Sequence, residues 1–165
     1  MADYCVQGCF AFRCTSAECA LIEEVFDIAA RLMNDEDGIA PSAAFLSAFP
    51  ATSADDRLSG FRSIFSDPQY PEIGAAFDQG VDQVQPTLHE ARFWSDTDFQ
   101  PYPVAEIIRH CCQDTLAKTP VGFAWAQSCS RPRVDGFGGG WCAIFCDRIV
   151  IETTSDALAQ ALALE

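Results

Sequence analysis

The chain has 165 residues, a formal net charge of −14 and 49% apolar residues. A chain of this length forms one domain and buries most of its unfolded surface without stabilising cross-links. The apolar content excludes a largely disordered protein, because disorder requires low hydropathy together with high charge. No apolar run approaches the roughly 18 residues of a transmembrane helix. Asp3 and Arg13 interrupt the stretch where a secretory signal would lie, so we expect a cytoplasmic protein without membrane association.

The negative charge is concentrated in the first half of the chain. Residues 1–90 contain 15 acidic and 4 basic side chains, a net charge of −11, whereas residues 91–165 contain 9 and 6, a net charge of −3. A surface of this sign repels phosphate groups, so direct nucleic-acid binding is not expected. Two explanations of the acidity stay open, namely general solubility and the binding of a basic protein partner.

Nine cysteines are present, and none stands in a C-x-x-C motif. Cys5 and Cys9, like Cys142 and Cys146, are four residues apart in segments that we predict to be strands, where this spacing separates the side chains by about 13 Å. Two thiolates that share a zinc ion must lie within roughly 4 Å of each other, so neither pair forms a metal site by itself. We interpret the cysteines as reduced thiols that serve as small apolar side chains.

The first elements in chain order are a strand and a helix. Apolar and polar side chains alternate from Val6 to Cys14, which is typical of a half-buried strand. Thr15 and Glu18 have the spacing of a capping box, which marks the N-terminus of a helix. The predicted helix is amphipathic and ends within residues 34–38. Its apolar stripe consists of Leu21, Val25, Ile28 and Leu32.

Residues 34–86 do not continue this pattern, and we interpret them as an insertion of loops and short helices into a simpler frame. A short helix is expected at Pro41–Phe49, ended by Pro50, and a second over Glu72–Asp78, ended by Gly80. The aromatic side chains of this segment are expected to form a satellite of the core. They are Phe61, Phe65, Tyr70 and Phe77.

The second half predicts a strand, a helix, three further strands and a last helix. The first five of these elements are expected at Leu88–Trp94, Pro103–Leu116, Val121–Cys129, Trp141–Cys146 and Ile149–Thr153. We expect Asp147-Arg148 to form a two-residue hairpin turn between the last two strands, and Ser155 to cap the last helix.

This order of elements predicts an α+β fold in a single domain over residues 1–165. The predicted sheet is largely antiparallel, with about five strands and with helices packed on one face. A doubly wound parallel sheet is the alternative, and it is disfavoured because no helices connect the last three strands.

The candidate ligand site is a glycine-rich segment near the carboxyl end of the chain. Its glycines allow a close approach of backbone amides to a ligand, two arginines stand beside them, and residues 128–149 sum to a charge of +1. Such a segment is typical of a loop that binds a carboxylate or a phosphate, although no helix follows as it would in a P-loop. A plain connection between strands is the alternative. The residues of the candidate site are Arg131, Arg133, Gly136, Gly138, Gly139 and Gly140.

No catalytic residue, metal-ligand set or cofactor is predicted. The motifs H-E-x-x-H and G-x-S-x-G are absent. Asp96 and Asp98 follow a predicted strand and are expected in a solvated turn. A nucleophilic pair of Cys129 with His89 or His110 is the one hypothesis for thiol chemistry, and it requires the two side chains to meet.

Three hypotheses for function follow, the third being a thiol-dependent or metal-dependent activity. The first is a non-catalytic binding protein for a basic partner, comparable in class to an immunity protein or an inhibitor. The second is a small enzyme or ligand-binding domain that holds an anionic ligand at Arg131 and Arg133. The absence of catalytic motifs and the strong acidity favour the first hypothesis. The oligomeric state does not follow from the sequence.

Overall fold

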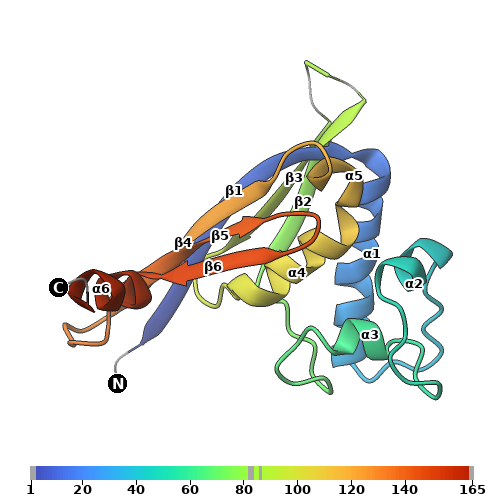
Figure 1. Ribbon diagram of the computed structural model, residues 1–165. Helices are drawn as coiled ribbons and strands as arrows, with labels where there is room; N and C mark the ends of the chain where they lie inside the picture. The colour runs from blue at the N-terminus through green and yellow to red at the C-terminus, as the bar shows by residue number, and fades with distance from the viewer. Residues whose placement is uncertain (1–2, 82–83, 86, 164–165) are drawn as a thin grey trace.

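The computed structural model describes residues 3–81, 84–85 and 87–163 (Figure 1). The described residues form six strands, which are β1 (Tyr4–Thr15), β2 (Ala76–Val81), β3 (Leu88–Ser95), β4 (Val121–Cys129), β5 (Gly138–Ile144) and β6 (Ile149–Thr153). They make one antiparallel sheet in the order β2-β3-β1-β4-β5-β6. The α+β fold and the antiparallel sheet are therefore confirmed, with one strand more than expected.

Helices cover one face of this sheet. The two longest helices that pack on it are α1 (Ser16–Met33) and α4 (Pro101–Cys111). The shorter elements are α2 (Ala43–Ala48), α3 (Ser59–Arg62), α5 (Gln113–Leu116) and α6 (Thr154–Ala163). α2 and α3 lie together beside α1, at the opposite end of the molecule from α6 (Figure 1). Among the described residues, no helix combines the length and the apolar character that a membrane crossing requires.

The core lies between α1, α4 and the sheet, and it is rich in phenylalanine. Phe10 of β1 stacks on Phe93 of β3 and on Phe123 of β4, with ring centroids 5.4 and 4.4 Å apart. Because side chains alternate along a strand, the intervening residues of β1 face away from the helices, and Cys9 and Ala11 are exposed. The alternation in the sequence thus correctly predicts the orientation of β1.

The start of α1 also agrees with the sequence. The hydroxyl of Thr15 accepts the backbone N–H of Glu18, and the Glu18 carboxylate accepts the backbone N–H of Thr15, so the capping box is confirmed. Val25, Ile28 and Leu32 are buried as expected.

Within residues 34–86, one predicted helix is wrong. The helix α2 lies inside the expected range Pro41–Phe49, but no helix forms over Glu72–Asp78. Instead, Ala76–Val81 is strand β2 and pairs with β3. Phe77 packs against Phe26 and Phe93, and this contact with the core decides between a helix and a strand in a short segment of ambiguous pattern. Residues 82–83 and 86 lie outside the described residues.

Three boundaries near the carboxyl end differ from the expectation. The predicted helix Pro103–Leu116 is divided at Cys112 into α4 and α5, because Glu18 binds Thr115 and holds α5 against α1. The loop between β5 and β6 comprises residues 145–148, closed by the N–H of Phe145 on the carbonyl of Arg148, rather than a two-residue turn. Thr153 instead of Ser155 caps α6, through the N–H of Asp156.

Candidate functional site

The glycine-rich segment is not one continuous loop. Gly138, Gly139 and Gly140 belong to β5 and pair with β4, so this strand begins three residues before the predicted Trp141. Arg131 and Arg133 lie in the exposed connection that precedes β5. One guanidinium nitrogen of Arg133 donates a hydrogen bond to the Tyr4 hydroxyl at 3.1 Å.

Two of these glycines are required by Trp125 of β4. Gly139 has a φ of +149°, and a Cβ atom there would lie 2.2 Å from the carbonyl oxygen of Trp125. A Cβ atom at Gly140 would lie 2.5 Å from the Trp125 indole ring. Packing within the sheet therefore accounts for Gly139 and Gly140. Gly136, buried against Cys129, lies before the strand. Anion binding at Arg131 and Arg133 stays a prediction.

Cys129 lies far from His89 in the sheet. His89 is in register with Cys14 at one end of β1, and Cys129 is in register with Tyr4 at the other end. The ten residue steps from Tyr4 to Cys14 span about 33 Å of strand, which excludes a Cys129–His89 pair.

His110 is engaged in structural contacts on α4. Its Nδ1 donates to the carbonyl oxygen of Ala48 at 2.7 Å, and its Nε2 accepts from Arg109 at 2.9 Å. These two partners select the neutral tautomer, because a carbonyl only accepts and a guanidinium only donates. Burial lowers the pKa of His110. With both ring nitrogens occupied, His110 has no free nitrogen to activate a thiol.

Several buried thiols are poor candidates for nucleophilic chemistry. The sulfur atoms of Cys14 and Cys19 lie 3.2 Å apart in the core. A hydrogen bond with Cys112, together with burial, raises the pKa of Cys14 to about 12. A thiol of this kind is a poor nucleophile. Among the described residues, no group of three or more His, Cys, Asp or Glu side chains is arranged to hold a metal ion.

A hollow of about 360 Å³ lies between α1, the segment 71–76 and the end of β3. We call it the acidic hollow, because three carboxylates and a half-exposed tryptophan stand beside its apolar lining. The residues that line the acidic hollow include Phe26, Met33, Glu72, Ile73, Trp94, Asp96 and Asp98. The carboxylates of Glu72, Asp96 and Asp98 are exposed, whereas Ile73 is buried.

Close backbone packing brings these carboxylates together. Gly74 has a φ of +66°, and a Cβ atom there would lie 2.4 Å from the carbonyl oxygen of Asp98. This contact places Glu72 beside the chain that follows β3. The N–H of Phe99 donates to the carbonyl oxygen of Val6, which attaches the same stretch to the sheet. The side chains of Glu72 and Asp98 are thus set by a glycine contact and a backbone hydrogen bond rather than by regular secondary structure.

The acidic hollow carries unbalanced negative charge. In the part of the chain that the structure describes, none of its three carboxylates forms an ion pair. The last turn of α1 borders the hollow through Met33, and the negative end of the helix dipole adds negative potential there. A hollow built in this way attracts a cation.

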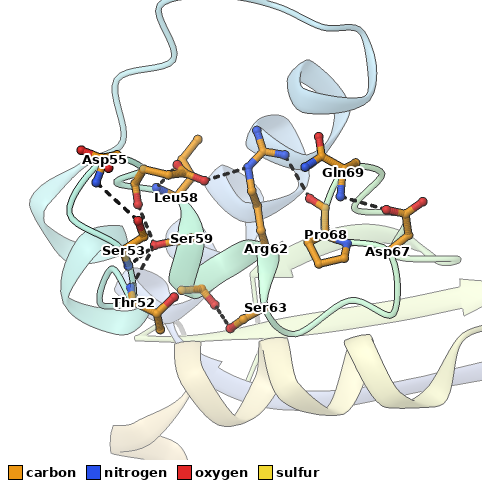
Figure 2. A network of polar contacts seen from close by, with 12 residues as sticks. Thr52, Ser53, Asp55, Leu58, Ser59, Arg62, Ser63, Asp67, Pro68 and Gln69 are labelled. Carbon is orange, nitrogen blue, oxygen red and sulfur yellow. Dashed lines mark hydrogen bonds and ion pairs between the residues drawn. The ribbon is translucent and has the colours of Figure 1, made fainter.

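Further acidic side chains follow directly after α1. Asp35, Glu36 and Asp37 line a smaller hollow of about 230 Å³ together with Arg62. Arg62 is held by Asp56, with a nitrogen–oxygen distance of 3.3 Å, and it donates to the carbonyl oxygen of Pro68 (Figure 2). The nearby arginine is therefore turned toward the polar network of residues 52–69 and not toward the acidic hollow.

The acidic hollow is not evident from the sequence, in which Asp96 and Asp98 are expected in a solvated turn and Glu72 in a helix. The one signal in the sequence is the pair of carboxylates, Asp96 and Asp98, that follow the predicted strand ending at Trp94.

Comparison of the chain with protein-family models, with curated proteins and with solved structures gave no match.

Proposed function

We propose that this chain is a non-catalytic binding protein that receives a basic segment of a partner protein in the acidic hollow. One observation carries the proposal: three carboxylates without basic partners among the described residues stand beside an apolar hollow and an exposed tryptophan. The net charge of −14 supports it, because a strongly acidic protein attracts a basic partner over a distance.

The hollow suits the two parts of a lysine or arginine side chain. The methylene stem of such a side chain packs on Phe26, Met33 and Ile73. Its charged end then reaches the carboxylates of Asp96 and Asp98 at the rim. Trp94, which also borders the hollow, is 45% exposed. An apolar lining with an acidic rim therefore favours a basic side chain over an acidic or a purely apolar one.

The proposal includes a reducing compartment, such as the cytoplasm. All nine cysteines are free thiols, and Cys9 and Cys146 are exposed to solvent. Exposed thiols persist where disulfide formation is suppressed.

A peptide titration with matched variants tests the proposal. In the hollow variant, Glu72→Gln, Asp96→Asn and Asp98→Asn are combined. In the control variant, Asp55→Asn, Asp114→Asn and Asp135→Asn are combined, so that three negative charges are removed elsewhere on the surface. The probe is a fluorescein-labelled hexa-arginine peptide, with hexa-glutamate as the negative control, and fluorescence anisotropy measures the Kd at low and moderate salt.

We expect the hollow variant to weaken hexa-arginine binding at least tenfold, and the control variant to weaken it less than twofold. The affinity of the wild type should also fall as the salt concentration rises, because the contact is electrostatic. If both variants weaken hexa-arginine binding equally, the peptide responds only to the overall negative charge of the protein, and the proposed site is wrong.

A further inference from the structure

A second cavity lies at the N-terminus of α4, on the side of the sheet that the helices cover. It encloses about 530 Å³, within the range of about 300–1,000 Å³ that is typical of small-molecule sites. Its walls combine four aromatic rings with two side-chain amides. We call it the aromatic pocket, and these residues are Phe65, Phe99, Tyr102, Trp125, Gln100 and Gln127.

Glycines on two strands make room for the rings of this pocket. Trp125 is in register with Gly8 of β1 on one side and with Gly140 of β5 on the other. A Cβ atom at Gly140 would lie 2.5 Å from the indole, and one at Gly8 would lie 2.9 Å from the Phe99 ring. The rings of Trp125 and Phe99 therefore lie close over glycine backbone. This arrangement forms a rigid aromatic surface before any ligand arrives.

The aromatic pocket has an uncharged lining within the described part of the chain. None of the described residues that line it is Asp, Glu, Lys, Arg or His, although the chain as a whole has a net charge of −14. The N-terminus of α4 does not supply the usual anion site either, because Pro101 and Pro103 have no backbone N–H. An anionic or a cationic ligand would have to leave its hydration shell here without a compensating charge.

The two amides provide the polar part of the site. Neither the Gln100 nor the Gln127 side chain has a hydrogen-bonding partner within the described ranges. A glutamine amide presents a donor and an acceptor next to each other. This pair matches the edge of a carboxamide or a lactam, which presents the complementary acceptor and donor.

We propose that the aromatic pocket binds an uncharged, planar aromatic molecule that carries a carboxamide or lactam edge. The rings of Phe65, Phe99, Tyr102 and Trp125 contact the flat faces of the ligand, and Gln100 and Gln127 bind its polar edge. This site is separate in chemistry and in lining residues from the acidic hollow, and it does not depend on the proposed function.

Three probes of nearly equal shape test the ligand class. They are 2-naphthamide, 2-naphthoate and 2-naphthamidinium, which are neutral, anionic and cationic. Titration into the ¹⁵N-labelled protein, followed by two-dimensional NMR, reports where each probe binds. We expect 2-naphthamide to bind with a Kd of about 1 mM and to shift the Trp125 indole N–H and the side-chain amides of Gln100 and Gln127. The anion 2-naphthoate should bind at least tenfold more weakly.

Two substitutions locate the binding. Ser66→Trp fills the mouth of the aromatic pocket from an exposed position, and Ser47→Trp adds the same bulk on the exposed side of α2. Naphthamide binding should weaken at least tenfold in the first variant and less than twofold in the second. Gln127→Leu should weaken it about fivefold without adding bulk to the walls.

The proposal is overturned if 2-naphthamide causes no shift at these residues, if 2-naphthoate binds equally well, or if Ser66→Trp has no larger effect than Ser47→Trp. Shifts caused by 2-naphthamidinium at the Trp94 indole N–H belong to the acidic hollow. They support the proposed function and do not bear on the aromatic pocket, so the two proposals fail separately.

Discussion

The acidic hollow and the aromatic pocket share one stretch of chain but are built in different ways. Asp98 lines the first, and its neighbours Phe99 and Gln100 line the second. The aromatic pocket takes part of its walls from the core, since Phe99 is 2% exposed and Phe65 is 6% exposed, whereas Tyr102 is 64% exposed. The acidic hollow takes its charge from exposed side chains in irregular segments. Substitutions of the charged side chains of the acidic hollow should therefore leave the fold intact. Substitutions of the buried rings of the aromatic pocket should lower the free energy of unfolding.

The largest expected effect concerns the backbone beneath Trp125. Gly139→Ala should destabilise the fold by more than about 3 kcal/mol, because it adds an unfavourable φ and a clash with the Trp125 carbonyl group. Gly80→Ala in β2 is the matched control, because a Cβ atom there meets nothing within 4 Å. Urea unfolding measures both. Equal stability of the two variants would contradict a structural role of Gly139 in seating Trp125.

The next prediction separates carboxylates that maintain the fold from those of the acidic hollow. Buried Glu18 accepts the backbone N–H of Thr15 at 2.8 Å, and it accepts both the N–H and the hydroxyl of Thr115 at 2.9 and 2.6 Å. Glu18→Ala should cost about 2–4 kcal/mol in urea unfolding, since it leaves these donors without a partner. A loss below about 1 kcal/mol would show that water replaces the carboxylate and that Glu18 does not hold α1 against α5.

The third prediction concerns the thiols of the core at alkaline pH. Burial raises the pKa of Cys142 from 9.0 to about 12. The pKa of Cys14 is also raised to about 12, by a hydrogen bond with Cys112 and by burial. Because the folded pKa lies above the unfolded one, this contribution to stability is complete below pH 9 and is lost as the pH rises toward 12. The urea midpoint should therefore fall between pH 9 and pH 10.5. A constant midpoint would contradict the burial of these thiols.

The exposed thiols should behave in the opposite way. Iodoacetamide at pH 8 should modify Cys9 and Cys146 first, since these two are exposed and the others are buried or half-buried. Intact-mass spectrometry after a brief reaction should show two rapid additions in the folded protein and nine after unfolding in urea. Nine additions at one common rate would contradict this division.

The smallest effect is expected for the hollow variant itself, in which Glu72, Asp96 and Asp98 are replaced by their amides. Its free energy of unfolding should equal that of the wild type or exceed it by up to about 1 kcal/mol, because repulsion between exposed carboxylates is removed. The gain should shrink at high salt. A clear loss of stability would show that these carboxylates support the fold, and the contrast with the aromatic pocket would disappear.

The sequence by itself determined the elements that rest on local interactions. Apolar and polar side chains alternate along β1 because the strand turns one face toward the core and the other away from it. The capping box of α1 needs only Thr15 and Glu18, three residues apart. The class of fold followed from the order of such elements. Of the candidate site, the sequence indicated the acidity and the carboxylates that follow Trp94, but not the hollow in which they gather.

The tertiary structure decided everything that depends on a contact between distant segments. Phe77 joins the sheet as part of β2 because Phe26 and Phe93 pack against it. Gly139 and Gly140 resemble a ligand loop in sequence, yet the residue that requires them, Trp125, lies on another strand, with its carbonyl group against Gly139 and its indole against Gly140. Likewise, Glu72 lines the same hollow as Asp98 because Gly74 allows the two backbone segments to pack closely. Such contacts leave no periodic signal in the sequence, because their partners are set by the folded chain and not by spacing along it.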